Sequence, residues 1–286
     1  MQKLILGTVQ LGIDYGINNF TGKPCIDEAH QILQVAWDND LRVLDTASAY
    51  GDSQSIIGQY HQQTGNHFLV NSKFTGTSIP VEEQLDKILV ELELETLNIY
   101  FCHDFKDFTN NPDLLMILNG LRKKKGKFKK IGLSVYDKSE MELAINTPEI
   151  DVIQLPFNLF DNINERGDLL AKAKENEKTI QVRSIFLQGL FFKSPEDLPS
   201  KLLALKPYIV KVNDIAKNLH LSIEELAIGY VVQQPLIDEI IIGVENVQQL
   251  KRNIELFSNH YSPVIIEEVN KIKMVDEQLL YPKNWN

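Results

Sequence analysis

A regular alternation of short apolar runs and amphipathic stretches constrains this chain more than any other feature. Eight runs rich in β-branched and aromatic residues recur, as expected for strands that are buried on both faces. The first seven begin 23 to 38 residues apart, and 60 residues separate the starts of the last two. The runs are Leu4–Val9, Arg42–Ala47, Phe68–Phe74, Asn98–His103, Lys129–Val135, Val152–Phe157, Thr179–Phe186 and Glu239–Val244.

Stretches with apolar residues at helical spacing separate these runs. Asp27 and Asn246 stand where they could cap the first and last helices of the series. The long gap Leu187–Ile237 must contain an insertion and a helix near Ile223–Val232, and a further helix is expected at about Ile265–Leu280. Eight strand–helix repeats predict an α/β fold, a single (β/α)8 TIM barrel with an extra C-terminal helix.

A length of 286 residues is also compatible with two other architectures. Two domains would fit the length, but no Pro-rich or Ser-rich linker divides the chain. A doubly wound open sheet usually carries Gly-x-Gly-x-x-Gly after a strand, and this sequence has no such motif. We therefore expect one domain over residues 1–286.

The composition narrows the classes of function. The chain has 29 Lys and Arg against 39 Asp and Glu, so the net charge of −10 argues against a broad nucleic-acid surface. The basic run Arg122–Lys130 is better explained as the end of a helix, where cations complement the helix dipole. No apolar stretch is long enough to span a membrane, and no signal peptide is evident. The two cysteines, Cys25 and Cys102, have no metal-site spacing and fit a cytoplasmic protein.

Four polar residues fall at the ends of three consecutive predicted strands. Asp45 and Tyr50 follow the second strand, Lys73 ends the third and His103 ends the fourth. In a barrel of this kind, the C-terminal ends of the strands form the active-site face. A cation beside a phenol favours the phenolate and lowers its pKa, while a carboxylate holds the ammonium. His103 would orient a substrate carbonyl.

A hydrolase interpretation starts from Gly51-Asp52-Ser53, which could contain a nucleophilic serine. That interpretation also needs Asp-x-x-His near the C-terminus, but Lys217 and Phe257 stand three residues before His220 and His260. The sequence therefore gives the hydrolase little support.

These residues resemble those of the aldo/keto reductases. Asp45–Ser53, read Asp-Thr-Ala-x-x-Tyr-Gly-x-Ser, is similar to the most specific motif of that family. The resemblance continues through most of the chain, in Gly126–Ser134, Gln154–Asn158, Ser184–Leu190, and Ile242–Gly243 with Gln249, Leu250 and Asn253. It implies a barrel that binds NADPH, less often NADH, without a Rossmann domain.

The resemblance also implies a role for each matched residue. Tyr50 would donate a proton to the carbonyl, Lys73 would lower the pKa of Tyr50, Asp45 would pair with Lys73, and His103 would orient the carbonyl. Ser134 and Gln154 would hold the carboxamide of the nicotinamide, and Gly7 and Thr8 would line the floor of the site. The remaining cofactor positions are Arg183, Ser184, Gly243, Glu245, Asn246, Gln249 and Asn253.

Some positions depart from the pattern of the family. Val135 stands where Asn is common, Gln54 where Glu is common, and Arg183 where an aromatic residue usually stacks on the nicotinamide. A planar guanidinium can also stack. Many relatives have Arg at the position of Glu245, and a carboxylate there would repel a 2′-phosphate, although Lys251 and Arg252 follow closely. NADPH remains the expected cofactor, with NADH as the alternative.

The sequence therefore predicts an NAD(P)H-dependent oxidoreductase that reduces an aldehyde or ketone. The loops decide the substrate in such barrels, and the polar loop Gln10–Lys23 suits a sugar or another hydroxylated carbonyl. The opening Leu6–Gly12 and the stretch Arg183–Leu190 resemble a bacterial branch often associated with carbohydrate biosynthesis. A barrel that binds nucleotide as a sensor, without catalysis, is the alternative. No metal, nucleic acid or membrane partner is expected, and the oligomeric state is not indicated.

Overall fold

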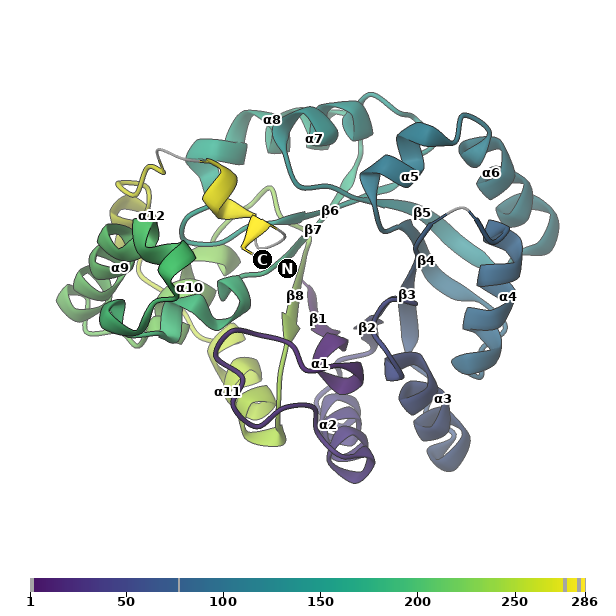
Figure 1. Cartoon of the computed structure of the whole chain (residues 1–286), viewed down its shortest axis with the longest axis horizontal. Coiled ribbons are helices and arrows are strands. Elements are labelled where there is room, and N and C mark those ends of the chain that lie inside the picture. The colour runs from purple at the N-terminus through teal and green to yellow at the C-terminus, as the bar shows by residue number, and fades with distance from the viewer. Residues whose placement is uncertain (1–2, 77, 275–276, 282–283, 286) are drawn as a thin grey trace.

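Eight parallel strands form a closed barrel in the order of the sequence (Figure 1). This is a computed structural model, and it describes residues 3–76, 78–274, 277–281 and 284–285. Each predicted run coincides with one strand, so the predicted (β/α)8 barrel is confirmed. The strands are β1 (Lys3–Gly7), β2 (Val43–Asp45), β3 (Leu69–Phe74), β4 (Leu97–Cys102), β5 (Phe128–Ser134), β6 (Val152–Pro156), β7 (Thr179–Arg183) and β8 (Glu239–Gly243).

Neighbouring strands pair in a register that aligns their C-terminal ends. Gly7 of β1 lies opposite both Asp45 of β2 and Gly243 of β8, which closes the ring. On the other side, Ser134 of β5 lies opposite Gln154 of β6. Because all strands run in the same direction, the residues that follow them gather at one end of the barrel.

Helices surround the strands, as Figure 1 shows. The longer helices bury an apolar stripe, for example Ala29, Ile32, Leu33 and Ala36 of α2. The helices are α1 (Val9–Gly12), α2 (Ile26–Asp38), α3 (Ser53–Thr64), α4 (Val81–Glu91), α5 (Phe105–Asn110), α6 (Leu114–Lys125), α7 (Lys138–Ile145), α8 (Ile163–Glu175), α9 (Lys206–Asn218), α10 (Ile223–Val232), α11 (Val247–Phe257) and α12 (Val264–Val269).

The two predicted helix caps have different outcomes. Asn246 caps α11, since its side chain accepts a hydrogen bond from Gln249 N at 2.9 Å. Asp27 does not cap α2, and that prediction is wrong. Cys25 is the capping residue because Glu28 accepts a hydrogen bond from its backbone N–H at 3.0 Å, which starts the helix at Ile26.

The insertion before β8 contains three 3₁₀ turns, followed by α9 and the predicted helix α10. The turns are Leu187–Phe192, Pro195–Asp197 and Ser200–Leu205.

The predicted C-terminal helix Ile265–Leu280 is wrong in its extent. Helix α12 ends at Val269, because the carbonyls of Asn270 and Ile272 accept hydrogen bonds from Asn164 and Asn162 instead of continuing a helix. A 3₁₀ turn, Glu277–Leu280, follows, while residues 275–276 of the predicted helix lie outside the described part of the chain.

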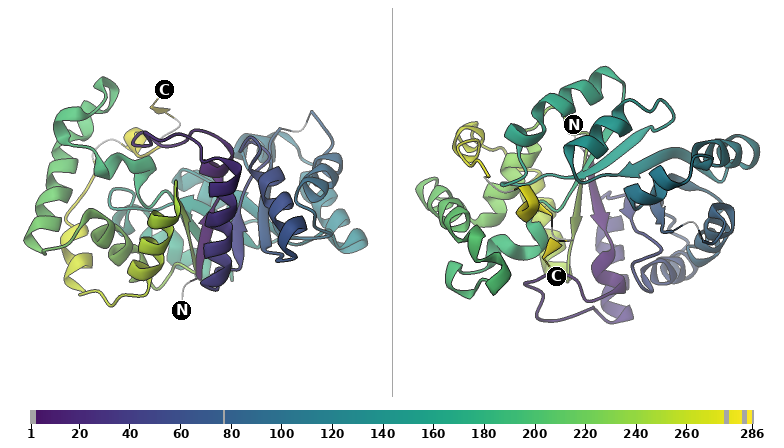
Figure 2. Two further views of the ribbon diagram at one scale, coloured as in Figure 1. Left: turned by 90° about the horizontal axis from the view of Figure 1, so that it is seen from below. Right: turned by 45° about the horizontal axis from the view of Figure 1, so that its top comes forward.

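Figure 2 (left) shows the long loop after β1 and the last turn of the chain at the same end of the barrel. The contact between the rings of Tyr281 and Tyr136, 6.0 Å apart, agrees with this placement, since Tyr136 follows the end of β5.

The basic run lies at the other end of the barrel, before and within β5. Arg122 pairs there with Asp151 at 2.7 Å, and Gly126 ends α6 in a left-handed conformation (φ 63°). The side chains of residues 124–125 lie outside the described part. Among the described helices, none is both long and apolar enough to cross a membrane.

Candidate active site

The C-terminal ends of β2, β3 and β4 bring together the four residues that the sequence singled out. Asp45 ends β2, Lys73 is the second-last residue of β3, and His103 directly follows β4. Tyr50 comes from the loop between β2 and α3. Its ring meets that of His103 edge-on, with centroids 5.8 Å apart, and lies 5.3 Å from Lys73 Nζ.

Asp45 and Lys73 form a buried ion pair at the bottom of this group. The Lys73 side chain is 1% exposed, and Nζ lies 2.5 Å from Asp45 Oδ1. Nζ also donates to the Thr46 carbonyl at 2.9 Å. Each of these buried charges stabilises the other, because removing either residue would leave a buried charge with neither water nor a counter-ion.

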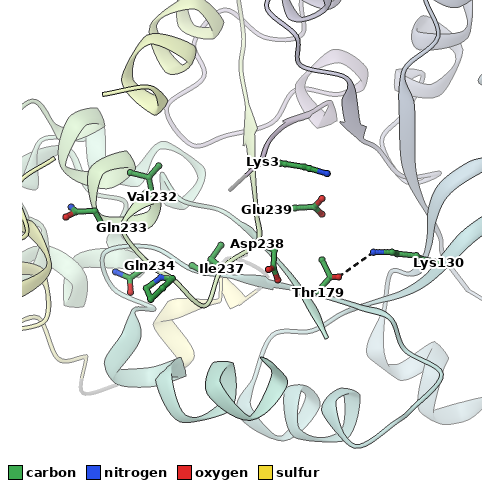
Figure 3. Close-up of a pocket in the computed structure, with 10 residues that line it drawn as sticks. Lys3, Lys130, Thr179, Val232, Gln233, Gln234, Ile237, Asp238 and Glu239 are labelled. Carbon is green, nitrogen blue, oxygen red and sulfur yellow. Dashed lines mark hydrogen bonds between the residues drawn. The ribbon is translucent and has the colours of Figure 1, made fainter. Parts of the chain in front are cut away.

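A chain of hydrogen bonds inside the barrel supports Asp45 from behind. Gln154 Nε2 donates to Asp45 Oδ2 at 2.9 Å and to Gln181 Oε1 at 3.0 Å, and Gln181 Nε2 donates to Glu239 Oε2 at 2.6 Å. Glu239 lines a separate 710 Å³ pocket at the opposite end of the barrel, beside Lys3 and Lys130 (Figure 3). The orientation of the Asp45 carboxylate is therefore fixed by a polar column through the barrel core.

Close backbone contacts hold the Tyr50 loop. A Cβ on Gly12 would lie 1.7 Å from the Tyr50 carbonyl oxygen, so only glycine lets α1 approach this loop. Gly51 has φ +55°, a conformation that glycine adopts readily. Ser53 Oγ then donates to Thr8 Oγ1 at 2.8 Å, and Thr8 N donates to the Asp45 carbonyl.

The electrostatics of the group correct one prediction. Burial, reinforced by the Asp45 carboxylate, raises the pKa of Tyr50, and Arg183 opposes this rise only in part. The expected net lowering of the Tyr50 pKa is therefore not found, because burial and the Asp45 carboxylate outweigh Arg183. Burial also lowers the pKa of Lys73. Burial, with Lys73 and Arg183, lowers the pKa of His103 to about 3, so this imidazole is neutral at ordinary pH.

A cavity of 1070 Å³ opens above these residues. Asp45, Tyr50 and His103 line one part of it, and most of the predicted cofactor positions line it as well: Gly7, Thr8, Arg183, Ser184, Gly243, Glu245, Gln249 and Asn253. Ser134, Gln154 and Asn246 do not line it. Ser134 and Gln154 are buried at strand ends, and Asn246 is engaged in capping α11.

One buried acceptor of the cavity lining fits a ligand with amide or hydroxyl donors. Gln10 Oε1 is buried and has no hydrogen-bond partner among the described residues, and Gln10 lines the cavity. Gln10 lies against Gly243, where a Cβ would stand 2.2 Å from its Oε1. An unpaired buried acceptor is costly unless a donor reaches it. This atom therefore suits an amide or hydroxyl group of a nicotinamide dinucleotide. Gln154 Oε1 is also unpaired, but Gln154 is fully buried outside the lining.

Charged residues of α10 and α11 border the far part of the cavity. Glu245 N donates to Gln249 Oε1 at 2.8 Å, and Gln249 Nε2 donates back to the Glu245 carboxylate at 3.3 Å. Arg252 lines the same region and pairs with Glu255 at 3.0 Å. This region thus presents a carboxylate just before α11 and a cation seven residues later, in the second turn of the helix.

Arg183 lies differently from the sequence-based expectation. Its guanidinium carbon is 4.4 Å from the ring centroid of Tyr136, so it stacks on a protein ring. Tyr136 lines the cavity and was missed in the sequence, although its place two residues after the end of β5 marks the same rim. Gln10 was also missed as a site residue, although it too follows the end of a strand in the sequence.

The loop after β1 closes over this side of the cavity. Ile17 N donates to the Gln188 carbonyl at 3.0 Å, and Gln188 Nε2 donates to Tyr15 OH at 3.0 Å. Gly189, with φ +86°, allows Asn18 to approach, since a Cβ there would lie 2.9 Å from Asn18 Cβ. The loops after β1 and β7 therefore form a bridge beside Tyr50.

Comparisons with known proteins agree with this geometry. The chain is 22% identical over 280 residues to the uncharacterized oxidoreductase YqkF of Bacillus subtilis, covering 89% of this chain and 90% of that protein. It is 21% identical over 276 residues to a D-threo-aldose 1-dehydrogenase of a Pseudomonas species, covering 80% and 83%. A solved aldo-keto reductase structure from Pseudomonas aeruginosa has the same fold, with a TM-score of 0.65, 22% identity and 89% coverage of both chains.

The model of the aldo/keto reductase family matches residues 3–276, from β1 to the segment after α12. This match covers every strand of the barrel and both sides of the cavity. Enzymes of this family are oxidoreductases that interconvert carbonyls and alcohols, and they generally use nicotinamide cofactors. The chain belongs to the aldo/keto reductase family.

Proposed function

We propose that this protein reduces an aldehyde or ketone to the alcohol, with Tyr50 as the proton donor and NADPH as the expected cofactor. One observation carries the proposal. Tyr50 and His103 face one cavity in edge-on contact, directly above the buried Asp45–Lys73 pair. One barrel domain over residues 1–286 would carry the whole function.

When bound, the reduced nicotinamide would supply a hydride to the carbonyl carbon, and the protein would supply a proton to the oxygen. The Tyr50 phenol is protonated at neutral pH and can donate that proton, and its raised pKa means that the charge left on its oxygen needs stabilisation. Neutral His103 can donate a second hydrogen bond to the same oxygen and so orient it. Lys73, fixed by Asp45, stabilises the negative charge that develops on the phenol oxygen as the proton leaves.

The shape of the cavity supports a dinucleotide as the second ligand. Its 1070 Å³ reaches from Tyr50 to Glu245 and Asn253 at α11, and is as large as typical pockets for small ligands. Gln10 Oε1, an unpaired acceptor in the lining, would accept a hydrogen bond from the cofactor. The other end would lie at the start of α11, where backbone N–H groups favour phosphate.

The test is the Tyr50→Phe variant, assayed by the oxidation of NADPH with aryl aldehydes, aldoses and keto sugars. These substrates are chosen because relatives include an aryl-alcohol dehydrogenase and a D-threo-aldose 1-dehydrogenase. A positioned general acid contributes about 100-fold or more, so kcat should fall at least that far while cofactor affinity stays within about threefold.

Tyr60→Phe is the matched control, because Tyr60 is a buried tyrosine of α3 whose hydroxyl donates to Gln34, away from the cavity. It should keep the activity of the wild type. Cofactor binding without turnover of any carbonyl by the wild type would contradict the proposal. So would a Tyr50→Phe variant that retains a third or more of the activity.

A further inference from the structure

Arg183 is a cation at the cavity that lacks an acidic partner. It is the last residue of β7, it lines the cavity together with Tyr50 and His103, and its guanidinium stacks on Tyr136 at 4.4 Å. Within the described ranges, no carboxylate lies within ion-pair distance of it. A charge held away from bulk water without a counter-charge is unfavourable.

Arg183 is half-buried, whereas the three fully buried cations of the described chain each bind a carboxylate or carbonyl groups. Lys73 pairs with Asp45, and Arg166 binds both oxygens of Asp161 at 2.7 Å. Lys178 donates to backbone carbonyls, including Ile150 O at 2.7 Å. Arg183 differs from them because its surroundings supply phenol rings instead of an anion.

Those surroundings lie at the reacting end of the cavity. The guanidinium of Arg183 stays charged, as arginine does in proteins: burial lowers its pKa, but the neighbouring Tyr136, Tyr50 and Tyr15 shift it upward overall. In turn, the charge of Arg183 depresses the pKa of His103, after burial and Lys73. The guanidinium is therefore near both groups that would contact the carbonyl oxygen.

The nearby charges leave a positive excess. Asp45 is paired with Lys73, and His103 is neutral, so the two cations Lys73 and Arg183 face a single carboxylate at this end of the cavity. Asp14 also lines the cavity, but it is exposed and accepts a hydrogen bond from the backbone of Lys23 at 2.7 Å. The carboxylates Glu224 and Glu245 belong to α10 and to the start of α11, at the part of the cavity proposed for the cofactor.

We propose that Arg183 binds an anionic group of the substrate, so that the preferred substrates are carbonyl compounds with a carboxylate or phosphate close to the carbonyl. This inference rests on the proposed function, because it assigns the substrate class of the same site. A guanidinium suits both anions, since its fork of N–H donors matches two of their oxygens. Tyr15 and Tyr136 can donate further hydrogen bonds to such a group.

The experiment compares two anionic carbonyl compounds, each with a close neutral analogue. 4-Carboxybenzaldehyde is paired with methyl 4-formylbenzoate, and glyceraldehyde 3-phosphate with glyceraldehyde. The two pairs separate carboxylate from phosphate. For at least one pair, the wild type should prefer the anion by about 10-fold or more in kcat/KM, and Arg183→Met should lose about 10- to 100-fold on the anion only. On the neutral partner it should stay within about threefold.

Arg183→Lys keeps the charge without the fork and should retain part of the preference, which also guards against misfolding of the Met variant. Lys193→Met is the control, because this half-buried cation lies over the ring of Phe20 at 5.1 Å and does not line the cavity. Titration of the holoenzyme with benzoate and benzamide gives a readout that needs no turnover. Benzoate should bind the wild type more tightly than benzamide does, and this difference should disappear in Arg183→Met.

Each other outcome overturns the inference. Equal kcat/KM within both pairs would do so, as would equal losses on anion and neutral partner in Arg183→Met. A loss of NADPH affinity in that variant would instead assign Arg183 to the cofactor. If the wild type reduces none of the four compounds, the proposed function fails, and the benzoate titration still decides separately whether Arg183 binds anions.

Discussion

The buried pair of Asp45 and Lys73 gives the sharpest test of the electrostatics. Asp45→Asn preserves the shape of the side chain but removes the charge, and it leaves Lys73, 1% exposed, without its counter-ion. Removing one partner of such a pair typically costs about 3–5 kcal/mol. The folded variant can avoid a buried unpaired charge if Lys73 loses its proton. Burial already lowers the pKa of Lys73, which favours this neutral form.

The stability of this variant should depend on pH, because the cost of deprotonating Lys73 does. Keeping a lysine neutral costs about 1.4 kcal/mol for each unit by which the pH lies below its unfolded pKa of about 10.4. The penalty is therefore about 4.6 kcal/mol at pH 7 and about 1.2 kcal/mol at pH 9.5. The sign is fixed, because a lysine whose folded pKa is depressed binds fewer protons in the folded state, so stability rises with pH.

Asp161→Asn is the matched control, since it exposes Arg166 to the same loss of a partner at nearly the same burial. A guanidinium cannot lose its proton, so this penalty should not change with pH. The assay is the difference in thermal midpoint between variant and wild type at pH 7 and pH 9.5. That difference should shrink several-fold for Asp45→Asn and stay constant for Asp161→Asn. Parallel behaviour of the two variants would refute the reasoning.

Two further predictions concern pH and the cofactor. Because the pKa of His103 is lowered to about 3, kcat/KM for carbonyl reduction should show no ionisation of this residue between pH 5.5 and 8.5. An inflection near pH 6.5 that disappears in His103→Asn would contradict this. Glu245→Arg should replace repulsion of a 2′-phosphate by attraction and raise the ratio of NADPH to NADH affinity by about 10-fold, measured by quenching of protein fluorescence. An unchanged ratio would show that Glu245 does not face that group.

Local sequence patterns predicted the barrel and the ring of strand-end residues. A strand that is buried on both faces appears in the sequence as a continuous apolar run, such as Val152–Phe157. Eight such runs at regular spacing are compatible with few folds. Once the strands are placed, the direction of a parallel barrel puts Asp45, Lys73 and His103 at one end. No contact between distant segments has to be known for that step.

Features that depend on partners distant in the sequence could not be predicted in this way. The C-terminal helix was expected to reach Leu280 because its apolar spacing continues, but Asn162 and Asn164, more than 100 residues earlier, bind the carbonyls that would extend it. Arg183 was expected to present its face to the nicotinamide. Whether it does so depends on Tyr136, which stacks on it from another strand end.

The charges at the cavity explain why the overall charge says little about the ligand. The chain carries a net charge of −10, yet the acid nearest the reacting end, Asp45, is neutralised by Lys73. His103 contributes none, so Arg183 leaves the site with one positive charge that no carboxylate of the described chain pairs with. A ligand in a low-dielectric cavity responds to such nearby charges, whereas surface charges are screened within about 10 Å by salt. An acidic protein can therefore select an anionic substrate, provided that one cation at the site is left without an acidic partner.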